Sequence, residues 1–234
     1  MNETLKVSRN ELKYAVSDYE VTLLKYRFKG ALKEDPYNKA DGYVIRSLYF
    51  DTYANTDYYE KLDGIEDRKK IRLRIYSPND KKAKLEIKRK YNNNQIKSSV
   101  TITREDAEEL IKMNYSVLDK YESKAAIQIK NIMKTNHLRP VVLIEYKRFA
   151  FMHDINNIRI TIDSDIKSSE TDFNLFSENI LFNPIEPIRS TLVEVKYDGY
   201  LLEWINQILS LHALDRMSFS KYTSSRFLFE NYLA

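Results

Sequence analysis

The stretch Ile71-Arg72-Leu73-Arg74-Ile75-Tyr76 alternates apolar and polar side chains with a period of two. Because successive side chains of a β-strand point to opposite faces of a sheet, this period predicts a strand. The three aliphatic side chains would lie on one face, and Arg72, Arg74 and Tyr76 would lie on the other. The stretch therefore predicts a strand on which two guanidinium groups project side by side.

Five other segments repeat this alternation, and their charged faces carry both signs: 11–13, 85–90, 146–148, 159–163 and 194–196. In 85–90, for example, Glu86, Lys88 and Lys90 share one face. Two interpretations are open. The charged faces are solvated, as is normal for one side of an antiparallel sheet. Alternatively, the strands close into a barrel whose interior of Arg, Lys and a few Glu suits a polyanion that brings a divalent metal ion.

The rest of the chain divides into strands and helices with no interdomain linker. Strands are predicted at 10–16, 43–50, 68–76, 83–91, 95–103, 140–151, 157–163 and 191–197. A helix is predicted from Ser17, which has capping-box spacing to Glu20, until Asp35-Pro36 stops it. Further helices are predicted at 104–113, 120–134, 200–212 and 220–232. The chain is thus predicted to be one α+β domain over residues 1–234, dominated by antiparallel strands.

The composition excludes several kinds of site. The 234 residues include no Cys, which excludes disulfides, thiolate zinc sites, iron–sulfur clusters and cysteine nucleophiles. His137, His153 and His212 are too far apart in sequence for a histidine zinc motif. The four glycines form neither a GxGxxG nor a GxxxxGK motif, so any bound phosphate would be held by side chains.

The charge and hydropathy of the chain do not identify a binding partner. The chain has 38 Lys and Arg against 34 Asp and Glu, and a net charge of +4 identifies no partner. Most aromatic residues fall within regular strand or helix patterns, which favours packing over base stacking, so no nucleic-acid partner is expected. No secretory signal and no apolar run of about twenty residues is present. A soluble, cytoplasmic protein without a transmembrane segment is therefore expected.

Seven segments in order resemble the VTC domain, the catalytic domain of the vacuolar transporter chaperone complex: ELKY (11–14), RSLYFDT (46–52), RLRIY (72–76), LEIK (85–88), YKRFAF (146–151), LVEVKY (192–197) and FSKY (219–222). This domain is a branch of the triphosphate tunnel metalloenzymes, and the resemblance spans nearly the whole chain. It implies an eight-stranded antiparallel tunnel with flanking helices. It also implies that basic side chains bind triphosphate and that glutamate holds Mn²⁺ or Mg²⁺.

The implied reaction transfers the γ-phosphoryl group of ATP to a growing polyphosphate chain and releases ADP. Two alternatives are open: a triphosphatase that uses the same tunnel, and a non-catalytic module that binds polyphosphate or another polyanion. The implied ligands are ATP or triphosphate and polyphosphate. The primer, the physiological metal, a membrane-protein partner and the oligomeric state are left open by the sequence.

The resemblance implies a role for particular residues of this chain. The residues matched to catalytic phosphate ligands are Lys13, Arg72, Arg74, Lys88 and Arg148. The implied metal ligand is Glu194, with Glu86 as a second candidate. The further substrate-binding residues are Arg46, Lys97, Lys196 and Lys221. One departure is Ser218, which stands where the last family motif often has lysine.

Overall fold

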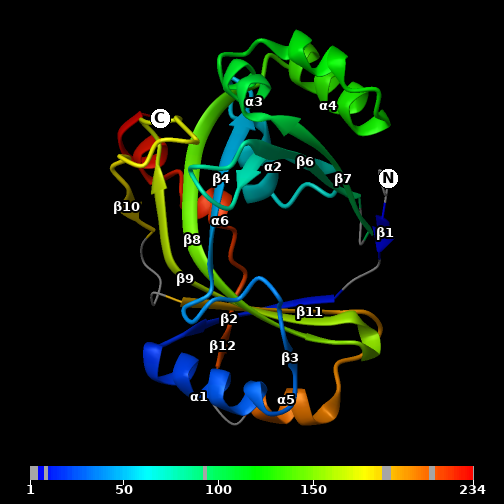
Figure 1. The fold of residues 1–234 in the computed structure, drawn as a ribbon, viewed down its shortest axis with the longest axis vertical. Coiled ribbons are helices and arrows are strands. Elements are labelled where there is room, and N and C mark those ends of the chain that lie inside the picture. The colour runs from blue at the N-terminus through cyan, green and yellow to red at the C-terminus, as the bar shows by residue number, and fades with distance from the viewer. Residues whose placement is uncertain (1–4, 8–9, 92–93, 186–190, 211–213, 234) are drawn as a thin grey trace.

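The computed structural model describes residues 5–7, 10–91, 94–185, 191–210 and 214–233. Eight long strands form one antiparallel sheet in the order β7, β6, β5, β4, β8, β9, β11, β2 (Figure 1). These strands are β2 (Asn10–Val16), β4 (Tyr43–Asp51), β5 (Arg68–Ile75), β6 (Lys82–Tyr91), β7 (Asn94–Thr103), β8 (Arg139–His153), β9 (Ile158–Ser169) and β11 (Thr191–Tyr197). The eight strands and the α+β class predicted from the sequence are confirmed.

Four short strands extend this sheet. β1 (Leu5–Val7) pairs with β7 at one edge, and β12 (Asp215–Arg216) pairs with β2 at the other. β3 (Lys33–Glu34) adds to β8, and β10 (Asn183–Pro184) adds to β9.

The sheet is strongly curled. β1 lies beyond β7, and β2 is the last of the long strands at the other end of the order, yet only two residues separate Val7 from Asn10. Three peptide units span at most about 11 Å, whereas eight strand spacings in a flat sheet would span about 38 Å. The two edges must therefore approach each other. Within the described ranges, no backbone ladder joins β7 directly to β2.

The curl follows β8, which pairs with β4 along one side and with β9 along the other. The register shifts between Tyr49 and Phe50 in the first pairing, and between Glu145 and Lys147 in the second. Such bulges bend a strand and increase its twist. They allow β8 to run from the β4 side of the molecule to the β2–β11 side (Figure 1).

Helices α1 (Asp18–Lys29) and α5 (Glu203–Ser210) cover the outer face near β2 and β11 (Figure 1). Their buried residues Leu24, Phe28 and Ile205 pack with the apolar faces of these strands. The predicted capping box is present. The Ser17 side chain accepts a hydrogen bond from the Glu20 amide, and the Glu20 carboxylate accepts one from the Ser17 amide at 2.6 Å. Helix α1 ends at Lys29, before Asp35-Pro36.

A second outer layer covers β5, β6 and β7. It consists of α3 (Arg104–Ile111), the 3₁₀ helix η1 (Tyr115–Lys120) and α4 (Lys124–Thr135), whose apolar residues share one core with these strands. Helix α4 begins later than the predicted position 120 because the Ser123 side chain caps it by accepting from the Ala126 amide. The apolar faces of β5, β6 and β7 thus face this helical layer, and their charged faces point away from it.

The C-terminal segment packs at one end of the curled sheet with α2 (Thr56–Leu62), which the sequence analysis did not predict. The predicted helix 220–232 is wrong as a single element. Two short helices replace it, α6 (Lys221–Ser224) and η3 (Phe229–Leu233), because Arg226 between them is buried and bound to Glu170 at 3.2 Å and to Asn55 at 3.0 Å. The predicted helix 200–212 begins at Glu203, and its end, with His212, lies outside the described residues.

Candidate functional site

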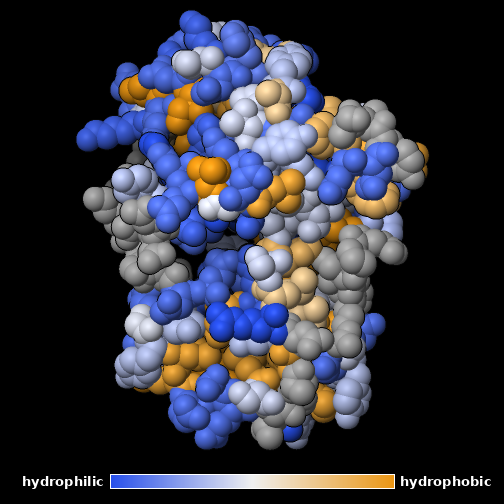
Figure 2. Space-filling view, turned by 180° about the vertical axis from the view of Figure 1, so that it is seen from behind, coloured by the Kyte–Doolittle hydropathy of each residue, from blue (hydrophilic) through white to orange (hydrophobic). Residues whose placement is uncertain are grey.

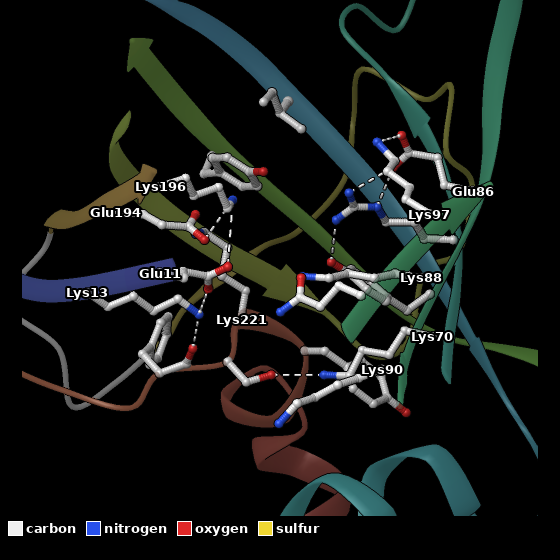
Figure 3. Close-up of a pocket in the computed structure, with 18 of the residues that line it drawn as sticks. Glu11, Lys13, Lys70, Glu86, Lys88, Lys90, Lys97, Glu194, Lys196 and Lys221 are labelled. Carbon is white, nitrogen blue, oxygen red and sulfur yellow. Dashed lines mark hydrogen bonds and ion pairs between the residues drawn. The ribbon is translucent and has the colours of Figure 1, made fainter. Parts of the chain in front are cut away.

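The curled sheet surrounds a cavity of about 1040 Å³. Fifteen Lys and Arg side chains and three Glu side chains line it, several of which are labelled in Figure 3. Figure 2 shows a hollow bordered by hydrophilic residues in the middle of the molecule. The charged strand faces thus line an interior and are not an open, solvated side of a sheet.

Glu86 on β6 holds three cations from the strands on either side. Its Oε2 lies 2.8 Å from Arg72 Nη2 and 3.7 Å from Arg74 Nη1, and its Oε1 lies 2.5 Å from Lys97 Nζ. Burial alone would raise the pKa of this carboxyl group, but the three cations outweigh it and lower the pKa below its ordinary value. Both oxygens face cations, and the metal role of Glu86 stays a prediction.

Asp163 on β9 is a second buried anchor. Its two oxygens accept from Nε and Nη2 of Arg148, each at 2.7 Å, and Lys221 Nζ lies 2.6 Å from Oδ2. Burial disfavours the charged form, but Arg148 and Lys221 lower the pKa of Asp163. Lys221 belongs to the C-terminal segment, which thereby brings a cation next to the cavity-lining face of β8.

Glu11 on β2 and Glu194 on β11 form a carboxylate pair. Lys196 Nζ lies between them, 2.8 Å from Glu194 Oε1 and 4.0 Å from Glu11 Oε2 (Figure 3). Lys13 Nζ contacts Glu11 Oε1 at 2.8 Å. Burial would raise the pKa of Glu194, but Lys196, Lys221 and Lys13 lower it well below its ordinary value. Two carboxylate groups therefore converge on a position that now holds a lysine ammonium group.

This pair fits a divalent cation that shares its coordination with phosphate. Mg²⁺ is commonly bound by one or two carboxylates together with substrate phosphates and water. A metal cage made by the protein alone is a different arrangement, and no group of three or more Asp, Glu or His side chains that could form one occurs in the part of the chain that the structure describes. The donor set therefore matches a metal that arrives with a polyphosphate ligand.

One end of the cavity is rich in lysine and arginine. Arg68 and Lys70 on β5 lie there, with Lys88 and Lys90 at the paired positions of β6. Burial, reinforced by Lys61, lowers the pKa of Lys70 to about 7. Burial also lowers the pKa of Lys88 to about 8, although water in the cavity reaches this side chain. These lysines repel one another until an anion binds.

Binding of inorganic triphosphate is expected to weaken as the pH rises through 7 and then 8. Phosphate favours the charged forms of Lys70 and Lys88, so binding takes up protons that these lysines lack at higher pH.

The free energy of unfolding of the free protein should instead increase as the pH rises. Between the folded pKa values and the unfolded value of 10.5 the unfolded chain binds more protons, so these two groups make the free protein more stable as the pH rises.

Calorimetry in buffers with different ionisation enthalpies measures this proton uptake. The control is Lys70→Arg, which keeps the charge but does not titrate in this range and should flatten the pH dependence. Equal affinity on both sides of pH 7 to 8, with no proton uptake, would contradict the assignment.

The cavity brings together all but one of the residues to which the resemblance gave a role. The lining residues among them are Lys13, Arg72, Arg74, Glu86, Lys88, Lys97, Arg148, Glu194, Lys196 and Lys221. Ser218 also lines the cavity, and so does Arg216. Their individual chemical roles remain predictions.

Arg46 is the exception, and its predicted place in the lumen is wrong. Residues Tyr43, Ile45 and Tyr49 of β4 line the cavity, so Arg46 points to the opposite face of the strand. There it is buried, 2.6 Å from Glu145 Oε2, and donates to the Leu175 carbonyl at 3.1 Å. The period of two already contained this information, because Arg46 is out of phase with the residues that line the cavity.

Several lining or supporting residues were not assigned from the sequence. The sequence could have placed Glu11 and Lys70 in the cavity. Each lies two residues before a predicted lining residue, Lys13 and Arg72 respectively, and therefore on the same face of its strand. Asp163 could not be placed in this way, because one acidic residue at the end of a strand pattern does not reveal which cations it meets.

An antiparallel sheet curled around a densely basic cavity with a carboxylate pair defines a protein class that binds phosphate-rich polyanions. The family described as "VTC domain" matches residues 8–229, and the chain belongs to this family. No curated protein matches the chain. Within the described ranges, no helix is long and apolar enough to cross a membrane.

Two solved structures share the fold. A candidate adenylate cyclase from Bacillus halodurans has 13% sequence identity and a TM-score of 0.55, and the alignment covers 92% of this chain and 95% of that one. A candidate adenylyl cyclase from Hippeastrum, described as having a dominant triphosphatase activity, has 14% identity and a TM-score of 0.56. The second alignment covers 95% of this chain and 96% of that one. At these identities the likeness concerns the fold alone.

Proposed function

We propose that this chain is a polyphosphate polymerase that transfers the γ-phosphoryl group of ATP to the end of a polyphosphate chain with Mn²⁺ or Mg²⁺. One observation carries the proposal: one cavity gathers fifteen basic side chains around the carboxylate pair of Glu11 and Glu194. Membership of the VTC domain family supports the same substrate class. The cavity offers enough positive charge for a triphosphate and a second phosphate chain.

The reaction requires little covalent participation by the protein. An oxygen of the terminal acceptor phosphate forms a bond to the γ-phosphorus while the bond from that phosphorus to the bridging oxygen of ADP breaks. Phosphoryl transfer depends mainly on alignment and charge neutralisation. Arg72, Arg74 and Arg148 present planar forks that donate paired hydrogen bonds to phosphate oxygens, and Glu86 and Asp163 hold these forks in place.

Glu194 and Glu11 would hold the divalent ion on the opposite wall. When bound, the ion neutralises charge on phosphate oxygens and orients them. Lys196, which lies between the two carboxylates, would be released to contact phosphate. The chain's own contribution is thus a fixed carboxylate pair facing a fixed set of guanidinium groups.

The decisive test incubates the purified chain with ATP and Mn²⁺, and follows polymer length on a gel together with ADP and inorganic phosphate. Long polymer with stoichiometric ADP is expected. Release of inorganic phosphate without polymer would replace the proposal with a triphosphatase. Binding of polyphosphate without any turnover of ATP would replace it with a non-catalytic binding module.

The triphosphatase is the second candidate because the Hippeastrum protein with the same fold is described as mainly a triphosphatase. In that reaction water takes the place of the acceptor phosphate, and the same basic residues bind the triphosphate. The product assay separates the two candidates directly.

Turnover by Arg74→Lys and Arg72→Lys is expected to fall about tenfold or more, equivalent to about 1.4 kcal/mol in the transition state. The two side chains leave β5 on the same face, about 7 Å apart at the backbone, a spacing that adjacent phosphoryl groups can bridge. Lysine keeps the positive charge but lacks the planar fork, so weak binding should remain. Steady-state kinetics measure the loss, and thermal melts control for folding. Wild-type turnover in both variants would place the phosphate site elsewhere.

A further inference from the structure

Three tyrosines form a row at one end of the cavity. The ring centroids of Tyr37 and Tyr43 are 6.4 Å apart, and those of Tyr43 and Tyr76 are 6.2 Å apart. Tyr43 and Tyr76 line the cavity, while Tyr37 continues the row outside it. The outer two rings are open to solvent, with Tyr37 77% and Tyr76 50% exposed. Aromatic faces are thus available where the cavity meets solvent.

The row of tyrosines lies at the end of the cavity opposite the lysine-rich end. On one face of the β5 segment the lining residues run in the order Arg68, Lys70, Arg72, Arg74, Tyr76. Tyr76 therefore lies about 13 Å beyond Arg72 along the strand, and Arg68 lies a similar distance before it. The phosphate-binding centre thus lies between an aromatic end and a cationic end, a spacing comparable to that between the phosphates and the base of an extended nucleotide.

The loop before β4 anchors Tyr37 and Tyr43. The Tyr37 amide donates to Asp35 Oδ1 at 3.0 Å, and the Asn38 side chain exchanges two hydrogen bonds with the Ala150 backbone of β8. Gly42 has φ +89°, and a Cβ there would lie 2.2 Å from the carbonyl oxygen of Arg148. This close approach seats Tyr43 directly beside β8. A platform held in this way loses little conformational entropy when a ligand stacks on it.

Polar groups lie at the edge of the row. Arg159 Nη2 is 2.5 Å from Asp35 Oδ2 and donates to the Tyr43 hydroxyl at 3.3 Å. Arg159 also lines the cavity. Aromatic faces beside a guanidinium and a carboxylate offer stacking together with donors and acceptors, the combination that binds a planar heterocycle. The lysine-rich end has no comparable row of exposed rings among the described lining residues.

We propose that Tyr37, Tyr43 and Tyr76 form the platform on which the purine base of the nucleotide stacks. The base lies at this end, the triphosphate lies along Arg74 and Arg72, and the γ-phosphoryl group faces the lysine-rich end. This inference rests on the proposed use of ATP. It explains why exposed rings gather at one end of an otherwise charged cavity, and it makes the cavity selective for a nucleotide over inorganic triphosphate.

The test compares two ligands by calorimetry: a non-hydrolysable ATP analogue and inorganic triphosphate. Tyr76→Ala and Tyr37→Ala are each expected to weaken binding of the analogue about fivefold or more, which corresponds to about 1 kcal/mol of stacking. Their affinity for inorganic triphosphate should stay within about twofold, because neither ring contacts phosphate. Tyr76→Trp should restore binding of the analogue.

The matched control is Tyr26→Ala, which removes a ring that is 82% exposed on α1, outside the cavity lining. It should alter neither affinity. Equal losses for both ligands, or no loss for the analogue in either tyrosine variant, would overturn the platform. Because the experiment measures binding, it tests the platform separately from the polymerase activity. If the chain makes no polymer but shows this ligand selectivity, the platform is supported and the proposed function is not. If the chain makes polymer but lacks the selectivity, the platform is contradicted.

Discussion

Asp163→Ala is expected to lower the free energy of unfolding by about 3 to 5 kcal/mol. Asp163 is fully buried and neutralises both Arg148 and Lys221. Removing it leaves two cations close together in a cavity that already has an excess of positive charge. Breaking one side of a buried ion network costs far more than losing a surface pair, because the remaining charges cannot be fully solvated.

Denaturant unfolding measures this loss, and Asp154→Ala is the matched control. Asp154 also pairs with a lysine, Lys33 at 2.5 Å, but that pair is exposed, so its loss should leave the free energy of unfolding nearly unchanged. Inorganic triphosphate should stabilise Asp163→Ala more than the native chain, since phosphate supplies the missing negative charge. A loss below about 1 kcal/mol, with unchanged triphosphate binding, would show that Asp163 is not an anchor of the site.

Glu194→Gln is expected to reduce metal-dependent turnover by at least about a hundredfold, equivalent to about 2.7 kcal/mol, while the chain stays folded. Glutamine keeps the shape of the side chain but removes the charge, so only the Glu11 carboxylate remains at the position suited to the metal. The apolar core does not depend on Glu194, which faces the cavity opposite the helix-covered side of β11.

Three measurements make this expectation specific: turnover as a function of Mn²⁺ concentration, Mn²⁺ affinity in the presence of inorganic triphosphate, and thermal melts. Glu122→Gln, which alters an exposed carboxylate before α4, should match the native chain in all three. A folded Glu194→Gln variant with native turnover and native Mn²⁺ affinity would move the metal site elsewhere in the cavity.

Local sequence patterns were sufficient for the strands and for the side chains that share a face. The alternation in 71–76 placed Arg72 and Arg74 together because strand geometry depends only on neighbouring residues. The Ser17 and Glu20 pair marked the start of α1 for the same reason. Arg46 shows that a motif match does not by itself tell which face of a strand a residue lies on. It belongs to a segment that resembles the family, but its side chain points to the face opposite the cavity.

The tertiary structure alone decided which charges meet. Glu86 holds Lys97 across a strand pair, and Asp163 meets Lys221, 58 residues later, so neither contact follows from local periodicity. The curl of the sheet is also non-local, because it depends on register shifts along β8 and on the short connection between β1 and β2. The sequence determined six strand segments with a charged face. Their curl around a common cavity, where repulsion among cations is offset by three lining glutamates and the buried Asp163, depends on contacts between segments far apart in the chain.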